Sequence, residues 1–260
     1  MAYTVYQLAT LANAVYYPGQ TLVGDWRRMA HFGDDSSGGF FASLYGRGSL
    51  SVLAFRGTND AWDIGPDAEI LLGSIPWQLP DAQIAMSRTK YAVRSAPLAL
   101  TGHSLGGALA CLMAAKTGLP CVTFNAPGVA RAYAVSVRTP LLPPDPVTTA
   151  IDGAIALASV DTAKILNIRA SYDVVSIGTG PRLGRVETIS VAGCGRVQAE
   201  KRKESLGSLL LSPGVMVAQG ASITAELVSK ASQFVVCQHG MELMEAALKN
   251  MPRYNQDLGW

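Results

Sequence analysis

The spacing of apolar residues predicts that helices and strands alternate along this chain. Residues 1–17 carry apolar side chains at helical spacing, which predicts an amphipathic helix. Two apolar runs, 40–45 and 50–55, flank a Gly-containing turn and predict a β-hairpin, whereas the polar, Gly-rich stretch 31–39 predicts a loop. The other predicted elements are a helix at 81–93, a strand from 98 into 104, a helix at 107–116, strands at 121–125, 164–170 and 185–191, and a final helix at 241–250.

This alternation predicts one α/β domain over residues 1–260, because each helix returns the chain for the next parallel strand. We expect a mostly parallel central sheet with antiparallel edge strands and flanking helices. Two segments interrupt the pattern. Residues 138–163 hold four prolines before an Ala-rich run, and residues 200–234 combine apolar helical patterns with a Ser-Pro-Gly break. We interpret both as helical cap insertions; the alternative is that they cover the sheet as ordinary outer helices.

Composition narrows the class of protein and its partners. Charged residues make up 15% of the chain and hydrophobic residues 49%, so the fold is either tightly packed or carries an exposed apolar surface, as a lipid-facing enzyme does. A formal net charge of +2 gives no electrostatic case for nucleic acid. No run reaches the ~20 apolar residues of a membrane span, and residues 1–17 lack the basic region of a signal peptide. We therefore expect a protein that is cytoplasmic as synthesised, and soluble or peripheral to a membrane.

The four cysteines, Cys111, Cys121, Cys194 and Cys237, lack the paired spacing of a metal site. Cys111 falls on a predicted helix and Cys121 on a predicted strand, and both elements should be buried. Without an export signal, free core thiols are favoured over disulfides.

Residues 98–107 carry the strongest chemical signal. Gly102, Ser104 and Gly106 form a Gly-x-Ser-x-Gly sequence between an apolar run and an Ala-rich helical segment. Small residues on both sides of the serine let such a turn close, and the helix that follows directs its positive end at a developing oxyanion. The pentapeptide alone arises by chance in Gly-rich chains. Together with the strand, the helix and the adjacent Gly107, however, it predicts a nucleophile elbow, with Ser104 as the attacking group of a hydrolase.

A serine nucleophile needs a general base, and the chain has only three histidines. His103 adjoins Ser104, so on an elbow its side chain should pack into the sheet or across the turn. His31 precedes the sheet core. His239 lies in a turn after all the predicted strands, where hydrolases with the order Ser, Asp, His present their base. We predict His239 as the base; the alternative is a surface histidine at a helix start.

The acid that orients His239 should lie between Ser104 and His239 in the sequence. Asp173 follows the predicted strand 164–170 directly and should emerge at the carboxyl edge of the sheet, so we predict Asp173, with a turn-capping aspartate as the alternative. The other acidic residues in this interval are Asp145, Asp152, Asp161, Glu187, Glu200, Glu204 and Glu226.

An oxyanion hole requires two convergent N–H donors. The residue after the nucleophile, Leu105, supplies one. Thr58 is the natural second, because it ends the strand at 50–56 after Gly57, which lets the backbone turn sharply. Arg56 is interpreted as a structural ion-pair residue rather than a substrate ligand.

The Phe-Arg-Gly-Thr sequence at 55–58, the Thr-Gly-His-Ser-Leu-Gly-Gly-Ala-Leu-Ala sequence at 101–110, Asp173 and His239 together resemble the class 3 lipase family of α/β-hydrolases. The resemblance implies hydrolysis of carboxylic esters of acylglycerols or phospholipids at a lipid interface. It also implies a Ser104, Asp173 and His239 triad, an oxyanion hole of Thr58 and Leu105, and neither a metal nor an organic cofactor.

The chain departs from secreted members of that family, since it has no Gly-x-Val-His-x-Gly-Phe segment and its stretches 138–163 and 200–234 are long. It looks more like bacterial members without a signal peptide, some of which are phospholipase A effectors that reach other cells by specialised secretion and pair with an inhibitor or immunity protein. A third hypothesis is an interaction protein that keeps the hydrolase scaffold without turnover.

Overall fold

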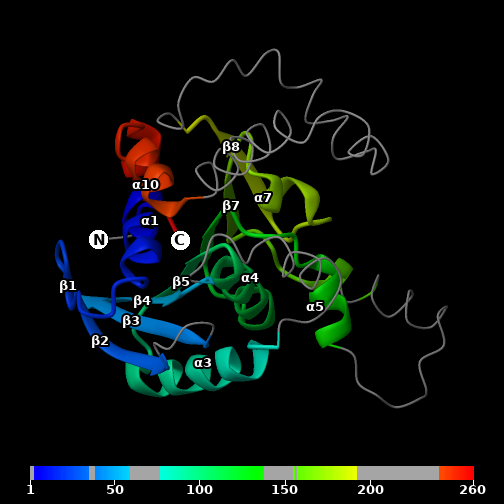
Figure 1. Cartoon of the computed structure of the whole chain (residues 1–260). Helices are drawn as coiled ribbons and strands as arrows, with labels where there is room; N and C mark the ends of the chain where they lie inside the picture. Colours follow the sequence, from blue (N-terminus) through cyan, green and yellow to red (C-terminus); the bar gives the residue numbers. More distant parts are fainter. Residues whose placement is uncertain (1–2, 35–38, 59–76, 138–154, 156, 192–239) are drawn as a thin grey trace, which may run out of the picture.

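The computed structural model describes residues 3–34, 39–58, 77–137, 155, 157–191 and 240–260. Within them, helices and strands alternate as the apolar pattern predicts (Figure 1). The N-terminal half comprises α1 (Val5–Ala14), β1 (Leu22–Val23), β2 (Trp26–Gly33), β3 (Phe41–Arg47), β4 (Leu50–Phe55), α3 (Leu79–Val93), β5 (Leu98–His103) and α4 (Leu105–Thr117). The rest comprises β6 (Cys121–Phe124), α5 (Ala130–Ser136), β7 (Ile165–Ala170), α7 (Val174–Gly178), β8 (Arg185–Ile189), α10 (Met241–Lys249) and the 3-10 helix η2 (Pro252–Asn255).

The eight strands form one sheet in the order β1 to β8. Neighbouring strands from β1 to β4 pair antiparallel, and those from β4 to β8 pair parallel. This confirms the predicted parallel core with antiparallel edge strands, and the antiparallel strands all gather at the N-terminal edge. The predicted hairpin is β3 and β4, whose turn contains Gly48 at a φ of 57°, a backbone conformation that glycine tolerates.

The predicted loop at 31–39 is partly wrong, because β2 extends through His31 to Gly33. Along β2, exposed residues alternate with residues that are half-buried, and Trp26 is the one buried residue of the strand. Every second residue therefore faces solvent, and the segment lacks the apolar run that marks a buried strand. Its pairing with β3, from Arg27 opposite Gly46 to Gly33 opposite Phe41, holds the segment extended. Cross-strand pairing of this kind has no local sequence signal.

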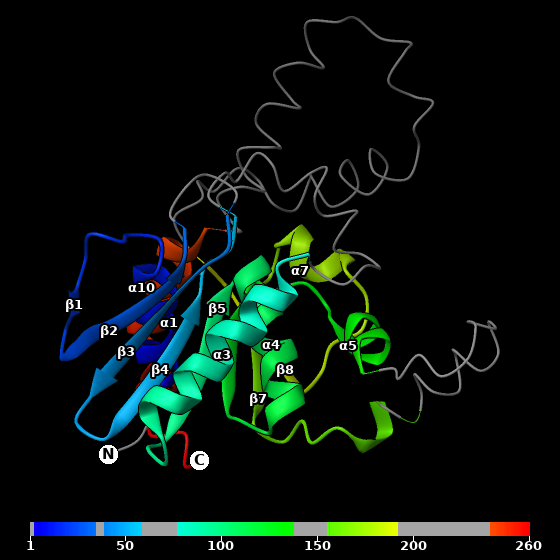
Figure 2. The same cartoon turned by 90° about the horizontal axis from the view of Figure 1, so that it is seen from below.

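Helices cover both faces of the sheet (Figures 1 and 2). Helices α1 and α10 pack on one face in a core that includes Leu8, Leu11 and Met244. Helices α3 and α4 pack on the other face, where the core includes Leu109 and Leu112. Residues 105–114 of α4 are buried on every side, which places this helix at the centre of its layer.

Local sequence sets the start of α1 and the end of α4. The Thr4 hydroxyl accepts a hydrogen bond from the Gln7 N–H at 3.1 Å, and the Gln7 side chain accepts one from the Thr4 N–H at 3.3 Å. This reciprocal capping box satisfies two N–H groups that a helix start otherwise leaves without partners. Gly118 ends α4 in the left-handed conformation, at a φ of 68°.

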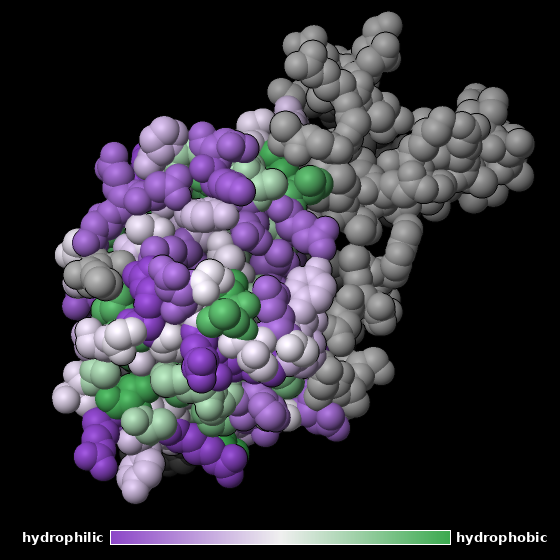
Figure 3. Space-filling view, turned by 90° about the vertical axis from the view of Figure 1, so that its left-hand side faces the viewer, coloured by the Kyte–Doolittle hydropathy of each residue, from purple (hydrophilic) through white to green (hydrophobic). Residues whose placement is uncertain are grey.

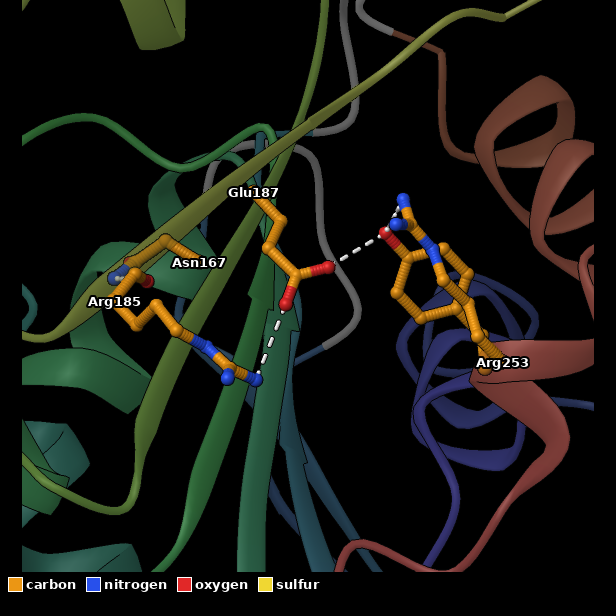
Figure 4. Close-up of polar contacts among 5 residues, drawn as sticks. Asn167, Arg185, Glu187 and Arg253 are labelled. Atoms are coloured by element: carbon orange, nitrogen blue, oxygen red, sulfur yellow. Dashed lines mark hydrogen bonds and ion pairs between the residues drawn. The ribbon is translucent and has the colours of Figure 1, made fainter.

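The C-terminal residues pack beside β8 and next to the N-terminus. The Tyr254 hydroxyl donates to Glu187 at 2.7 Å, and Glu187 pairs with Arg185 at 3.1 Å (Figure 4). The Leu258 N–H donates to the Tyr3 carbonyl at 2.9 Å. The two ends of the described chain therefore lie next to each other, and the C-terminal end is bonded to β8.

Most hydrophobic side chains are buried in these two cores. On the face that holds α10 and β1, the hydrophobic residues form small patches separated by hydrophilic ones (Figure 3). None of the helices in the described part of the chain is both long and apolar enough to span a bilayer. Cys111 and Cys121 are buried free thiols, as predicted, whereas Cys194 and Cys237 lie outside the described residues.

The predicted cap insertions lie largely outside the described residues. Of the first insertion, the structure describes residue 155 and residues 157–163, where Leu157 and Val160 pack against the core on the α4 side. The second insertion, 200–234, lies wholly outside them.

Candidate active site

Ser104 stands between β5 and α4 in a strained backbone conformation. Its φ is 55° and its ψ is −128°, values that an L-residue rarely adopts, and it is the residue that precedes the first turn of α4. The Ser104 N–H donates to the Phe124 carbonyl at 3.0 Å, and the Ser104 carbonyl accepts from the Ala108 N–H at 3.1 Å. These bonds hold the turn from the strand side and from the helix side.

Close backbone contacts explain the glycines around Ser104. A Cβ on Gly102 would lie 2.4 Å from the Gly106 carbonyl oxygen, and a Cβ on Gly106 would lie 2.1 Å from the Phe55 carbonyl oxygen. Both distances are far below van der Waals contact. The first contact closes the elbow, and the second lets α4 approach the end of β4. The predicted nucleophile elbow is therefore present, with the requirement for glycine at both positions.

The segment 56–58 passes directly beside Ser104. A Cβ on Gly57 would lie 3.2 Å from the Ser104 Cβ and 2.8 Å from the His103 carbonyl oxygen. Thr58, the predicted second oxyanion donor, is the next residue and is partly buried. Leu105, the predicted first donor, is the first residue of α4, where N–H groups have no acceptor within the helix. The structure thus brings the segments that carry the two predicted donors together at Ser104.

Tyr16, just beyond the end of α1, is a site residue that the sequence analysis missed. Its hydroxyl oxygen accepts from the Gly57 N–H at 3.0 Å and lies 2.9 Å from His103 Nδ1. The two rings meet edge-on at 5.9 Å between centroids. Burial raises the pKa of Tyr16 well above its usual value, which keeps the phenol protonated. His103 is buried and packs across the turn, as the sequence predicts.

Arg56 and His31 both contact the ring of Phe41. The buried Arg56 guanidinium lies 4.8 Å from the centroid of the Phe41 ring and donates to the Gly39 carbonyl at 3.5 Å. These contacts hold the side chain against an aromatic ring and the backbone, and the predicted ion pair stays a prediction. His31 stacks on the same ring at 5.8 Å, on a strand separated from β5 by β3 and β4.

Asp173 follows the carboxyl end of β7, as predicted. It is fully buried and caps α7, where its Oδ2 accepts from the Ser176 N–H at 3.0 Å. The Asp173 N–H donates to the Ala170 carbonyl at 3.3 Å, which ties the carboxylate to the strand end. The turn-capping role and the position expected of an acid that orients a histidine thus occur in the same residue.

Asn125 links the strand next to Ser104 to the strand that leads to Asp173. It has a φ of 47°, it is fully buried, and its Oδ1 accepts from the Ala170 N–H at 2.8 Å. Its own N–H donates to the Ile168 carbonyl at 2.9 Å. Asparagine tolerates this conformation better than most residues, yet neither its position nor its role has a recognisable signal in the sequence.

Arg182 contributes positive charge near Asp173. Its guanidinium donates to the Ala126 carbonyl at 3.0 Å. Burial lowers the pKa of Arg182, the charge of Arg169 lowers it further, and the charge of Asp173 partly restores it. Arg182 is a second residue of this edge that the sequence analysis missed.

His239, the predicted base, lies outside the described residues, but the helix that follows it is described. Helix α10 begins at Met241 and is bonded to the end of α1 at two points. The Asn13 side chain donates to Glu245 at 2.8 Å, and the Tyr17 hydroxyl donates to Glu242 at 2.6 Å. The chain after His239 is therefore anchored to the same helix end that carries Tyr16.

The part of the chain that the structure describes holds no cluster of three side chains suited to a metal ion. A cavity of about 320 Å³ does exist, lined by Leu166, Arg185, Glu187, Arg253 and Tyr254 among others. Figure 4 shows three of these residues, Arg185, Glu187 and Arg253. Leu166 and Arg185 lie at the amino ends of β7 and β8, whereas Ser104 follows the carboxyl end of β5. This cavity is therefore separate from the elbow.

Comparison with known proteins assigns this chain to a family. The family of the Tle-like phospholipase domain matches residues 7–142, just over half of the chain. The chain belongs to this family. Its matched range contains Tyr16, Thr58, Ser104 and Leu105, and ends before Asp173. The sheet with its nucleophile elbow is an α/β-hydrolase fold.

Individual relatives match over shorter ranges. The chain is 39% identical over 135 residues to an extracellular phospholipase A1 of Serratia liquefaciens, a match that covers 48% of this chain and 42% of the relative. It is 44% identical over 57 residues to the putative lipase ATG15 of Mycosarcoma maydis, covering 22% of this chain and 11% of the relative. The chain thus spans less than half the length of these relatives. A Rhizomucor miehei lipase structure in complex with its propeptide is 15% identical, with a TM-score of 0.44, over 66% of this chain and 61% of that chain.

Proposed function

We propose that this chain hydrolyses carboxylic esters of lipids through an acyl-enzyme on Ser104. The observation that carries the proposal is the elbow: a serine at a φ of 55°, ahead of α4, with Gly57 packed against its Cβ. Strained nucleophiles of this kind expose the hydroxyl to an ester and place it beside N–H donors at a helix start. The buried Asp173 at the same sheet edge supports an assisted nucleophile.

In the proposed reaction, the Ser104 Oγ attacks the ester carbonyl carbon while His239 accepts the hydroxyl proton. The carbonyl oxygen becomes an oxyanion that accepts hydrogen bonds from the N–H groups of Thr58 and Leu105. Collapse of this intermediate breaks the ester bond, and the leaving alcohol takes the proton from His239. Water then attacks the acyl-enzyme by the same route and releases the fatty acid, while Asp173 orients His239 throughout.

We propose glycerophospholipid in a membrane as the substrate. The family assignment and the Serratia phospholipase A1 support this class over triacylglycerol. Large hydrophobic side chains also lie exposed near the predicted site: Tyr172 precedes Asp173 and is 40% exposed, and Ile177 on α7 is 49% exposed. Trp77 precedes α3 and is 66% exposed. Because α3 carries the chain from the end of β4 back to the start of β5, its N-terminal end lies towards the carboxyl edge. Such side chains favour contact with a lipid surface.

The test is fatty-acid release from phospholipid vesicles, a triacylglycerol emulsion and a short-chain nitrophenyl ester. Ser104→Ala should abolish release from every substrate while the far-UV circular dichroism stays unchanged. Ser87→Ala is the matched control, because Ser87 lies exposed on α3 and donates to the Gln83 carbonyl one turn earlier in the same helix. Preferred release from vesicles supports the phospholipase proposal. Release from the soluble ester alone contradicts the lipid substrate, and release by Ser104→Ala contradicts the mechanism.

Two expectations stay predictions: that the protein acts as an effector on membranes of other cells, and that an inhibitor protein binds it. The expected site of synthesis, the cytoplasm, stays a prediction as well.

A further inference from the structure

One tyrosine joins two parts of the predicted machinery that are far apart in the sequence. The Tyr16 hydroxyl contacts the Gly57 N–H at 3.0 Å and His103 Nδ1 at 2.9 Å. Gly57 precedes the predicted oxyanion donor Thr58, and His103 precedes the predicted nucleophile Ser104. No motif in the sequence assigns a role to Tyr16.

We propose that Tyr16 is a positioning residue for the oxyanion hole, because its hydroxyl fixes the backbone at Gly57 relative to Ser104. The inference rests on the proposed function and deepens it, since it assigns a residue of α1 to the reaction of the same site. Tyr16 acts through Gly57 and His103, without touching the reacting ester.

The hydrogen-bond inventory at the hydroxyl supports this role. A phenol offers one donor and accepts through its lone pairs. The Gly57 N–H donates to the Tyr16 oxygen. Depending on the tautomer of His103, the Tyr16 hydroxyl either donates to His103 Nδ1 or accepts a second hydrogen bond from the Nδ1–H group. In either arrangement the hydroxyl bridges both partners. Burial raises the pKa of the phenol, so this bridge persists across the neutral range.

The space around Gly57 shows why the bridge sets a position. A Cβ at residue 57 would lie 2.5 Å from the Tyr16 hydroxyl oxygen, 2.8 Å from the His103 carbonyl oxygen and 3.2 Å from the Ser104 Cβ. Gly57 is therefore in contact with the hydroxyl on one side and with the elbow on another. Removal of the hydroxyl opens the first side and leaves the buried Gly57 N–H without its acceptor. The backbone can then move away from Ser104 and take the N–H of Thr58 with it.

Donors that stabilise an oxyanion act on the transition state far more than on the bound substrate. Displacement of a catalytic group by about 1 Å can cost about 100-fold in rate. Loss of the Tyr16 hydroxyl should therefore lower kcat and leave KM nearly unchanged. A merely structural tyrosine would lower the thermal midpoint without a selective loss of kcat in the folded protein.

The experiment compares wild type, Tyr16→Phe and Tyr91→Phe on phospholipid vesicles and on a soluble nitrophenyl ester. Tyr91 is the matched control, because it lies on α3 with its side chain 87% exposed. For each protein, kcat and KM are measured at a temperature at which circular dichroism shows it fully folded. The inhibition constant of a trifluoromethyl ketone is measured as well, because its adduct with a serine carries an oxyanion like that of the reaction. Gly57→Ala is a second variant, expected to displace the same segment, should Tyr16→Phe fail to fold.

We expect Tyr16→Phe to lose at least about tenfold in kcat, to change KM less than about twofold, and to weaken the ketone by the same factor as kcat. Tyr91→Phe should match wild type. Unchanged kcat in Tyr16→Phe, or a lower kcat with unchanged ketone affinity, overturns the inference and leaves the proposed function standing. A wild type that hydrolyses none of the esters overturns the proposed function, and the inference with it.

Discussion

Asn125 offers a test of how backbone strain and a single buried hydrogen bond hold the two sides of the site together. Its φ of 47° is unfavourable for most residues, and its Oδ1 accepts from the Ala170 N–H at 2.8 Å. Asn125→Ala removes the acceptor and leaves a side chain that tolerates this φ poorly. Asn125→Gly removes the acceptor too, but relieves the strain.

The two substitutions differ in a way that free energies can resolve. Loss of the acceptor leaves the buried Ala170 N–H unpaired in both variants, at about 1–3 kcal/mol. Alanine in the left-handed region adds about 1–2 kcal/mol, whereas glycine adds only about 0.5–1 kcal/mol through its freedom in the unfolded chain. We therefore expect Asn125→Ala to be the less stable variant, by about 1 kcal/mol. This order reverses the usual ranking of the two residues.

The assay is urea unfolding followed by circular dichroism, with fatty-acid release measured in parallel. Gln83→Ala, at an exposed position on α3, is the control and should change the free energy of unfolding by less than about 0.5 kcal/mol. The Ala variant should also lose activity, because Ala170 anchors the turn that holds Asp173. An alanine variant as stable as wild type, or a glycine variant no more stable than the alanine variant, would refute the reasoning.

Other consequences are open to direct measurement. Gly106→Ala should lower the free energy of unfolding by at least about 1–3 kcal/mol through overpacking, because its Cβ would lie 2.1 Å from the Phe55 carbonyl oxygen. The variant should also lose activity, and a fully active and stable variant contradicts this contact. Burial raises the pKa of Tyr3 to about 12, so the folded protein keeps a proton that the unfolded chain loses near pH 10, and the free energy of unfolding should fall from pH 10 to 12. Tyr3→Phe should flatten that slope, and an equal slope in both proteins argues against it. Burial also raises the pKa of the Cys111 thiol to about 12 and raises that of the Cys121 thiol well above its usual value. Peptide mapping after iodoacetamide should therefore find both unmodified until urea is added, and labelling of either in the native protein is the contrary result.

The sequence predicted elements wherever a local pattern was sufficient. The apolar periodicity located α1, α3 and α4, and the final helix, to within a few residues. It also located the strands of the parallel core. Where the signal required cross-strand pairing, as in β2, it failed, because a strand with one exposed face resembles a polar loop until its partners are known.

The sequence by itself determined the backbone turn at Ser104, because such an elbow is a local device: its glycines, its strand and its helix are contiguous in the chain. The position of Asp173 could also be predicted, since a strand end fixes which edge of the sheet the next residues occupy. Only the tertiary structure decided that Tyr16 meets Gly57 and His103, and that Asn125 holds Ala170. These contacts join segments 41, 87 and 45 residues apart, and no local pattern encodes which distant backbone groups packing brings within hydrogen-bond distance.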